Sequence, residues 1–90
     1  GEEKDIDIIE VKVDKSSILN NKKIGQLTIR KIFNSTVIGV YRDNSLIVSI
    51  NPETDLLVGD RIIVFGKKSN LKKLQEAIKN NDPKLLINNN

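Results

Sequence analysis

Two arginines are the side chains of this sequence best suited to hold an anionic ligand. Arg30 lies where a predicted helix gives way to a predicted hairpin, whereas Arg42 falls in the hairpin turn itself. A guanidinium group holds a phosphate or a carboxylate through two parallel hydrogen bonds. We therefore interpret Arg30 as the candidate anion-binding residue and Arg42 as a turn residue. A salt bridge at the surface or between two copies is the alternative role for Arg30.

The acidic residues form no pattern that points to catalysis. Asp5 and Asp7 stand in a polar N-terminal stretch, and Asp55 and Asp60 flank a predicted turn, so both pairs are interpreted as solvated or turn-forming. The N-terminal acids offer oxygen ligands to a hard cation such as calcium, but they are not spaced as a ligand loop.

Whole classes of chemistry are excluded by composition. The chain has no Cys, His, Met or Trp, which excludes thiolate zinc sites, a Cys nucleophile and a His general base. Its glycines are isolated and match neither a dinucleotide-binding nor a phosphate-binding loop. We therefore expect no enzyme activity, no metal site and no catalytic residue.

The positive charge of the chain is mild and gathers near its end. Fifteen Lys and Arg residues against twelve Asp and Glu give a net charge of +3. A basic helix face at Lys68, Lys72, Lys73 and Lys79 is interpreted as solvated, and binding to phosphates or to an anionic surface is its alternative. With one Tyr and two Phe, the chain lacks the stacking platforms of single-strand binders. We expect no nucleic-acid partner, and a nucleic-acid-binding module is the least favoured alternative.

Hydrophobic periodicity predicts six elements. The predicted strands span residues 6–13, 36–41, 46–50 and 61–65, and the predicted helices span residues 22–33 and a segment that starts at an N-cap, Ser69, and stops at Asp82-Pro83. Between the second and third strands, residues 42–45 supply a tight hairpin turn. Asn51-Pro52 ends the third strand.

The element order predicts an α+β fold. We expect a single small domain with the order strand, helix, strand, strand, strand, helix, and a mainly antiparallel sheet with helices packed on one face. Residues 1–5 are expected to be a flexible N-terminal segment, residues 6–80 the folded domain, and residues 81–90 a C-terminal tail that frays in its asparagine run. Pairing of two copies would cover the open edge of such a small sheet.

Several segments, in their order, resemble the TrkA-C (RCK-C) domain family. They are residues 17–19, 23–27, 29–33, 37–42, Asn51-Pro52 and 58–66. The resemblance extends over about residues 6–80. It implies a dimeric, cytoplasmic regulatory domain that acts at the inner face of the cell membrane. Its partner there is a potassium channel or transporter. In many members, an attached Rossmann domain connects the regulatory domain to this partner. The chain is then either a piece of a longer protein or a stand-alone subunit.

In family members that bind cyclic di-AMP, the resemblance implies a site at the dimer interface. The positions carried over are Ile24, Gly25, Arg30, Ile32, Ser35, Thr36 and Pro52. Arg30 of each copy would neutralise a phosphate, while Ile24, Ile32 and Pro52 would flank the adenine faces. Thr36 departs from the family pattern, since those binders tend to carry an asparagine there and a hydroxyl has fewer donors. The alternative is a structural dimerisation module without a small-molecule ligand.

Overall fold

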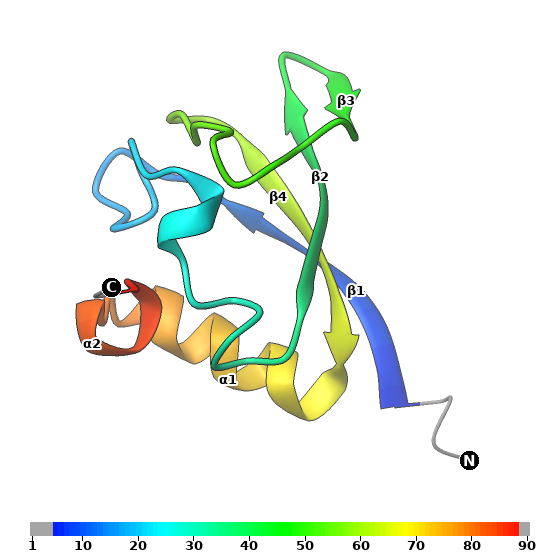
Figure 1. Cartoon of the computed structure of the whole chain (residues 1–90), viewed down its shortest axis with the longest axis vertical. Coiled ribbons are helices and arrows are strands. Elements are labelled where there is room, and N and C mark those ends of the chain that lie inside the picture. Colours follow the sequence, from blue (N-terminus) through cyan, green and yellow to red (C-terminus); the bar gives the residue numbers. More distant parts are fainter. Residues whose placement is uncertain (1–4, 89–90) are drawn as a thin grey trace.

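The computed structural model describes residues 5–88, which form one four-stranded sheet, two α-helices and a 3₁₀ turn (Figure 1). The elements in chain order are β1 Ile6–Lys12, η2 Ile24–Gln26, β2 Thr36–Arg42, β3 Ser45–Ile47, β4 Arg61–Lys67, α1 Lys68–Lys79 and α2 Pro83–Leu86. The predicted α+β class is confirmed. Of the segment 1–5 that was expected to be flexible, all but Asp5 lies outside the described residues, as do Asn89 and Asn90.

The sheet has the order β1-β4-β2-β3, and every neighbouring pair is antiparallel. Ile62 of β4 stands opposite Val11 of β1 and Val40 of β2, and all three side chains are buried. They face α1, whose Leu71 and Leu74 are also buried. The core therefore lies between one face of the sheet and α1, because successive strand residues point to opposite faces.

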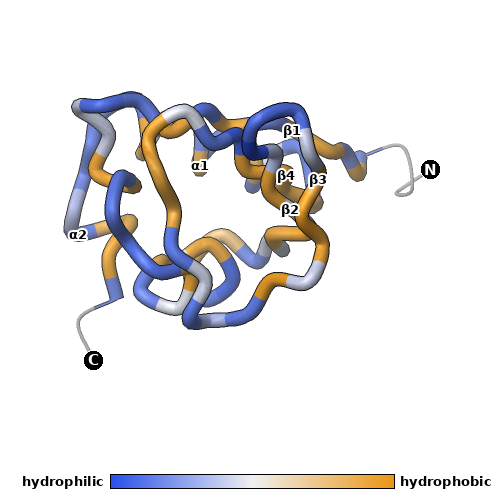
Figure 2. Tube along the Cα trace, turned by 90° about the horizontal axis from the view of Figure 1, so that it is seen from above, coloured by the Kyte–Doolittle hydropathy of each residue, from blue (hydrophilic) through white to orange (hydrophobic). Residues whose placement is uncertain are grey.

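The other face of the sheet is uncovered in the described part of the chain. Ile8 stands opposite Phe65, and their side chains are 54% and 42% exposed. Leu46, opposite Tyr41 in the hairpin, is 50% exposed. Figure 2 shows apolar stretches along the strands and hydrophilic stretches in the turns between them.

The predicted hairpin is confirmed, and its turn has a specific backbone. Asp43 and Asn44 both have positive φ, 50° and 65°, as a two-residue type I′ turn requires. The second strand is shorter than predicted, because β3 ends at Ile47 instead of residue 50. The segment after it turns away, and residues 52–54 hydrogen-bond to η2 instead.

The predicted helix over residues 22–33 is wrong. Only Ile24–Gln26 form a short 3₁₀ turn, and residues 29–33 form a separate turn. The Ile24 N–H donates to the Thr54 carbonyl at 3.0 Å, and the Thr28 N–H donates to the Leu86 carbonyl at 3.0 Å. Backbone groups that a helix would pair internally are therefore satisfied by segments distant in sequence.

The C-terminal half is helical as expected, with two differences. Helix α1 begins at Lys68 with Lys67 as its N-cap, so the predicted cap Ser69 lies inside the helix. Beyond Asn81, α2 starts at Pro83, and the Asp82 side chain accepts hydrogen bonds from two of its N–H groups. Leu86 is fully buried, so the segment up to residue 88 is docked on its own domain. The rest of the asparagine run that was expected to fray lies outside the described residues. No helix of residues 5–88 has the length and apolar character needed to cross a membrane.

Candidate functional site

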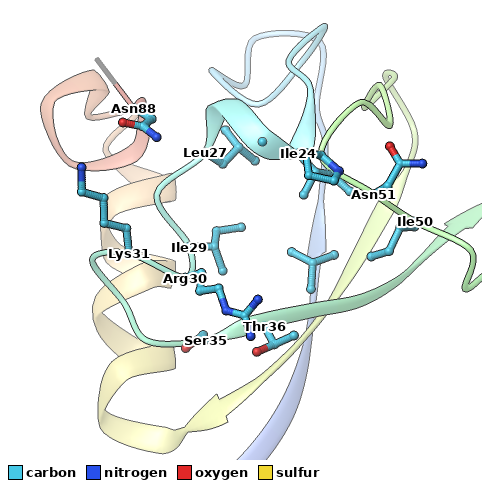
Figure 3. Close-up of a pocket in the computed structure, with 13 residues that line it drawn as sticks. Ile24, Leu27, Ile29, Arg30, Lys31, Ser35, Thr36, Ile50, Asn51 and Asn88 are labelled. Carbon is cyan, nitrogen blue, oxygen red and sulfur yellow. The ribbon is translucent and has the colours of Figure 1, made fainter. Parts of the chain in front are cut away.

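A pocket of about 420 Å³ lies between η2, the turn before β2, the loop after β3 and the end of the C-terminal segment (Figure 3). Its lining residues are Ile24, Gly25, Leu27, Ile29, Arg30, Lys31, Ser35, Thr36, Val37, Ile50, Asn51, Pro52 and Asn88. The volume lies within the range of small-molecule sites, about 300–1,000 Å³. Its lining comes from three separate parts of the chain: residues 24–37, residues 50–52 and Asn88.

One wall of the pocket is a close contact between η2 and the loop after β3. The Gly25 N–H donates to the Pro52 carbonyl at 2.9 Å. A Cβ atom on residue 25 would lie 2.8 Å from the Pro52 Cβ and 2.9 Å from the Pro52 oxygen. Real Cβ atoms do not approach so closely, so glycine is needed for Pro52 to sit in this wall.

The same loop is fixed at its other end by a mostly buried ion pair. Arg42 donates to both carboxylate oxygens of Asp60 and to the Asp55 carbonyl, and the Leu57 N–H donates to Asp60 as well. Burial raises the pKa of Asp60, but the hydrogen bonds from Arg42 and the Leu57 N–H outweigh it and bring the pKa below its ordinary value. The hydrogen bond to Asp60 likewise raises the pKa of Arg42.

A second ion pair holds the pocket wall from the solvent side. The Lys23 ammonium lies 3.0 Å from a carboxylate oxygen of Asp55. The hydrogen bond that Lys23 donates to Asp55 raises the pKa of Lys23. Asp55 and Asp60, interpreted as solvated or turn-forming, both have basic partners. Asp60 closes a turn, since its N–H donates to the Leu57 carbonyl, but its side chain is buried instead of solvated. Arg42, interpreted from the sequence as a turn residue, is in fact the partner of Asp60.

The turn that carries Arg30 is fixed by its own backbone. The Asn34 N–H donates to the Arg30 carbonyl at 3.1 Å, and the Ser35 N–H donates to the Ile29 carbonyl at 3.1 Å. The buried Ser35 hydroxyl donates to the Phe33 carbonyl. Ile29 is buried beneath the turn, whereas Arg30 is exposed. The guanidinium is thus presented to the pocket from a rigid base.

The pocket is apolar in its floor and positive at its rim. Ile24, Leu27, Ile29, Val37 and Ile50 supply the apolar surface. The charged residues of the lining are Arg30 and Lys31, and it contains no carboxylate. Within residues 5–88, Arg30 forms no ion pair. Such a pocket is suited to an anion that also has flat apolar faces.

Six of the seven positions singled out from the sequence surround this pocket: Ile24, Gly25, Arg30, Ser35, Thr36 and Pro52. The seventh, Ile32, does not. It lies with Phe33 and Lys73 in a second groove between the turn and α1, and 48% of it is exposed.

The sequence reasoning did not name the other lining residues: Leu27, Ile29, Lys31, Val37, Ile50, Asn51 and Asn88. The neighbours of named residues, such as Lys31 and Asn51, follow from adjacency along the chain. Asn88 carries no local signal, because its place depends on the docking of α2 against residues 26–28.

The remaining candidate groups lie apart from the pocket. The four lysines of the basic helix face are all exposed on α1, opposite its buried leucines, as expected of a solvated face. Within residues 5–88, no three acidic side chains come close enough to hold a metal ion. Glu2 and Glu3, considered with Asp5 and Asp7 as cation ligands, lie outside the described residues.

Comparison with known proteins gives consistent matches. The sequence model of the TrkA-C domain matches residues 8–79. The chain is 32% identical over 83 residues to "Probable potassium channel protein 2" of Methanocaldococcus jannaschii, and the alignment covers 92% of this chain and 24% of the relative. The chain spans between 12 and 24% of the length of the curated relatives it matches.

Two solved structures share the fold over most of their length. One is the RCK C domain of the potassium transport protein KtrA in complex with cyclic diadenosine monophosphate. Its TM-score is 0.73 and its identity 27%, and the match covers 83% of this chain and 86% of that one. The other is the RCK_C domain dimer of Streptococcus agalactiae BusR in complex with c-di-AMP. Its TM-score is 0.69 and its identity 22%, over 80% of this chain and 95% of that one.

Proposed function

This chain belongs to the TrkA-C domain family, and we propose that it is the ligand-sensing regulatory domain of a potassium or other cation transport protein. Its ligand is cyclic di-AMP, bound where two copies of the domain meet. The partner is a membrane channel or transporter subunit, reached from the cytoplasmic side through an attached domain of the Rossmann type.

The observation that carries the proposal is the position of Arg30 above an apolar floor. Cyclic di-AMP has two phosphates and two adenines. Arg30 would donate to a phosphate, while Ile24 and Pro52 would pack against an adenine face. Because no carboxylate lines the pocket, nothing there opposes the negative charge of the ligand. The KtrA and BusR structures, both complexes with this nucleotide, support the choice of ligand.

A second copy would complete the site. One Arg30 matches one phosphate, so a ligand with two phosphates fits a pair of pockets related by a two-fold axis. Strand β2 pairs with β3 only at residues 40–42, which leaves Thr36–Ile38 with one strand neighbour within the described sheet. This open edge borders the pocket through Thr36 and Val37 and is a place where another copy can add main-chain contacts.

Regulation follows if the ligand prefers one arrangement of the two copies. A ligand shifts an equilibrium only by the difference between its affinities for the two states. A molecule that contacts both copies binds the arrangement that brings its two half-sites together more tightly. The attached transport protein would then respond to the distance or angle between the two domains.

The test is isothermal titration of the domain with cyclic di-AMP, after its oligomeric state has been measured by light scattering. We expect one nucleotide per two chains. Arg30→Ala should weaken binding by about 10- to 100-fold, since charge-assisted hydrogen bonds are lost from both copies. Arg61→Ala is the matched control, because Arg61 lies on the outer face of the sheet over Tyr41. This variant should bind cyclic di-AMP with the affinity of the parent. Unchanged affinity of the Arg30 variant would refute the proposed site.

A structural dimerisation module is the second candidate. It is favoured by the uncovered sheet face, where Ile8, Leu46 and Phe65 are each exposed by 42% or more. Exposed apolar surface of this kind marks protein contacts. If the domain is only a dimerisation module, light scattering should show a stable dimer. The same titration should then show no binding of cyclic di-AMP, ATP or calcium.

A further inference from the structure

We infer that Asn88, in the segment after α2, is a specificity-determining residue of the pocket and that its carboxamide pairs with the amino edge of a purine base of the ligand. The inference deepens the proposed function and rests on it. Residues 80–88 lie beyond the part of the chain that the family's sequence model matches, 8–79. The family's sequence model therefore does not include this wall of the pocket.

The backbone of the segment is fixed to the pocket wall on both sides of Ile87. The Thr28 N–H donates to the Leu86 carbonyl at 3.0 Å, and the Asn88 N–H donates to the Gln26 carbonyl at 2.7 Å. These two hydrogen bonds make Leu27 and Ile87 an isolated antiparallel β-bridge. The Thr28 hydroxyl also donates to the Leu85 carbonyl. Leu86, fully buried in the core, holds the segment from beneath. The backbone of Asn88 is therefore tied directly to η2.

The side chain of Asn88, unlike its backbone, is available to a ligand. Asn88 is partly buried and lines the pocket. Within residues 5–88, its carboxamide makes no hydrogen bond to another residue. Figure 3 shows Asn88 on the same side of the pocket as Lys31, across Leu27 from Asn51 and Ile24. An unpaired amide on an apolar wall is a group that a ligand can satisfy.

A side-chain amide can distinguish adenine from guanine at the base edge that carries N7 and the neighbouring exocyclic group. Adenine presents a donor at its exocyclic amine beside an acceptor at N7, which match the oxygen and the NH₂ of an amide. Guanine presents two acceptors on that edge, so the amide oxygen would face another oxygen. Arg30 would hold the phosphate. A base that packs against Ile24 and Pro52 and extends across Leu27 would turn this edge toward the wall that Asn88 forms.

The experiment compares the affinities of cyclic di-AMP and cyclic di-GMP for four forms of the domain: the parent, Asn88→Ala, Asn88→Gln and Asn80→Ala. Asn88→Ala should bind cyclic di-AMP about 3- to 10-fold more weakly and lose most of the preference over cyclic di-GMP. Asn88→Gln keeps the amide and should restore part of that preference. Asn80→Ala is the matched control, because Asn80 is exposed at the end of α1 and outside this pocket. Melting temperatures should stay within about 2 °C of the parent, because the backbone of Asn88 anchors the segment.

The outcomes separate the inference from the proposed function. If the parent binds cyclic di-AMP and Asn88→Ala keeps both its affinity and its preference, the inference is overturned and the proposed function stands. If Asn88→Ala lowers the melting temperature and leaves the preference unchanged, Asn88 has a structural role and the inference is also overturned. If the parent binds no cyclic di-AMP, both are overturned.

Discussion

The guanidinium of Arg42 donates two hydrogen bonds to the carboxylate of Asp60, from Nε at 2.9 Å and from Nη2 at 2.8 Å. The pair joins the end of β2 to the residue before β4, and the Asp60 side chain is only 2% exposed. Arg42 also donates to the Asp55 carbonyl, so the loop that carries Pro52 into the pocket is held at its far end. Stability and pocket shape therefore depend on the same contact.

Loss of the Asp60 carboxylate should destabilise the domain strongly. Asp60→Ala leaves the Arg42 guanidinium and the Leu57 N–H without their acceptor, and we expect a loss of about 2–4 kcal/mol of unfolding free energy in urea. Glu10→Ala is the control, because Glu10 pairs with Arg61 at 3.4 Å on the surface and should cost less than about 1 kcal/mol. Equal losses in the two variants would contradict the importance of the buried pair.

The contribution of Asp60 should disappear in acid. Its folded-state pKa is lower than its unfolded value, so the unfolded state binds the proton more readily. The stabilisation is therefore fully present above about pH 5, begins to fall near the unfolded pKa of about 3.9, and is lost as the pH passes through the folded-state pKa. The measurement is the difference in unfolding free energy between the parent and Asp60→Asn from pH 7 to pH 3. If the difference in unfolding free energy between the two proteins stays constant down to pH 3, the ionised Asp60 carboxylate is not the source of the stabilisation.

The elements that follow from the sequence are those determined by local residues. The turn at Asp43-Asn44 needs two positive φ angles, which these two residue types tolerate, and the flanking strands are β-branched. The alternation in β1 places Val11 in the core as its period predicts. Helix α1 follows from the spacing of Leu71 and Leu74, although its first residue does not, because β4 runs directly into it.

The features that do not follow from the sequence depend on contacts between distant segments. Residues 22–33 have apolar spacings that favour a helix, yet Ile24 and Thr28 donate to carbonyls more than 25 residues away. The same long-range pairing brings Asn88 into the pocket. For the site, the family resemblance named six of the thirteen lining residues, and it also named Ile32, which lies in the second groove because the direction of a side chain depends on the turn that carries it.

Gly25→Ala should damage the pocket more than the fold. The added Cβ would force Pro52 outward, because it meets both the side chain and the backbone of that residue. If the pocket binds cyclic di-AMP, we expect affinity to fall by about 10-fold or more in titration, because the two walls separate. Gly59→Ala is the control: Gly59 has a φ of 93°, so alanine there strains the backbone and lowers stability by about 1 kcal/mol, but it lies outside the pocket. A Gly25 variant with normal affinity would show that the Pro52 wall does not contact the ligand.

The docking of the C-terminal segment can be tested on two adjacent leucines. Leu86 is fully buried, whereas Leu85 is 42% exposed, so the two substitutions remove the same atoms from opposite environments. Leu86→Ala leaves a cavity beneath the segment and should cost about 2–5 kcal/mol of unfolding free energy in urea, while Leu85→Ala should cost less than about 1 kcal/mol.

Hydrogen exchange of the Thr28 and Asn88 amides gives a second measurement, because both donate across the contact that Leu86 supports. These amides should lose protection in Leu86→Ala before the amides of β4 do, since the segment can detach while the sheet stays folded. If both leucine variants have the stability of the parent, the segment contributes nothing to the core and the wall that carries Asn88 is not held in place.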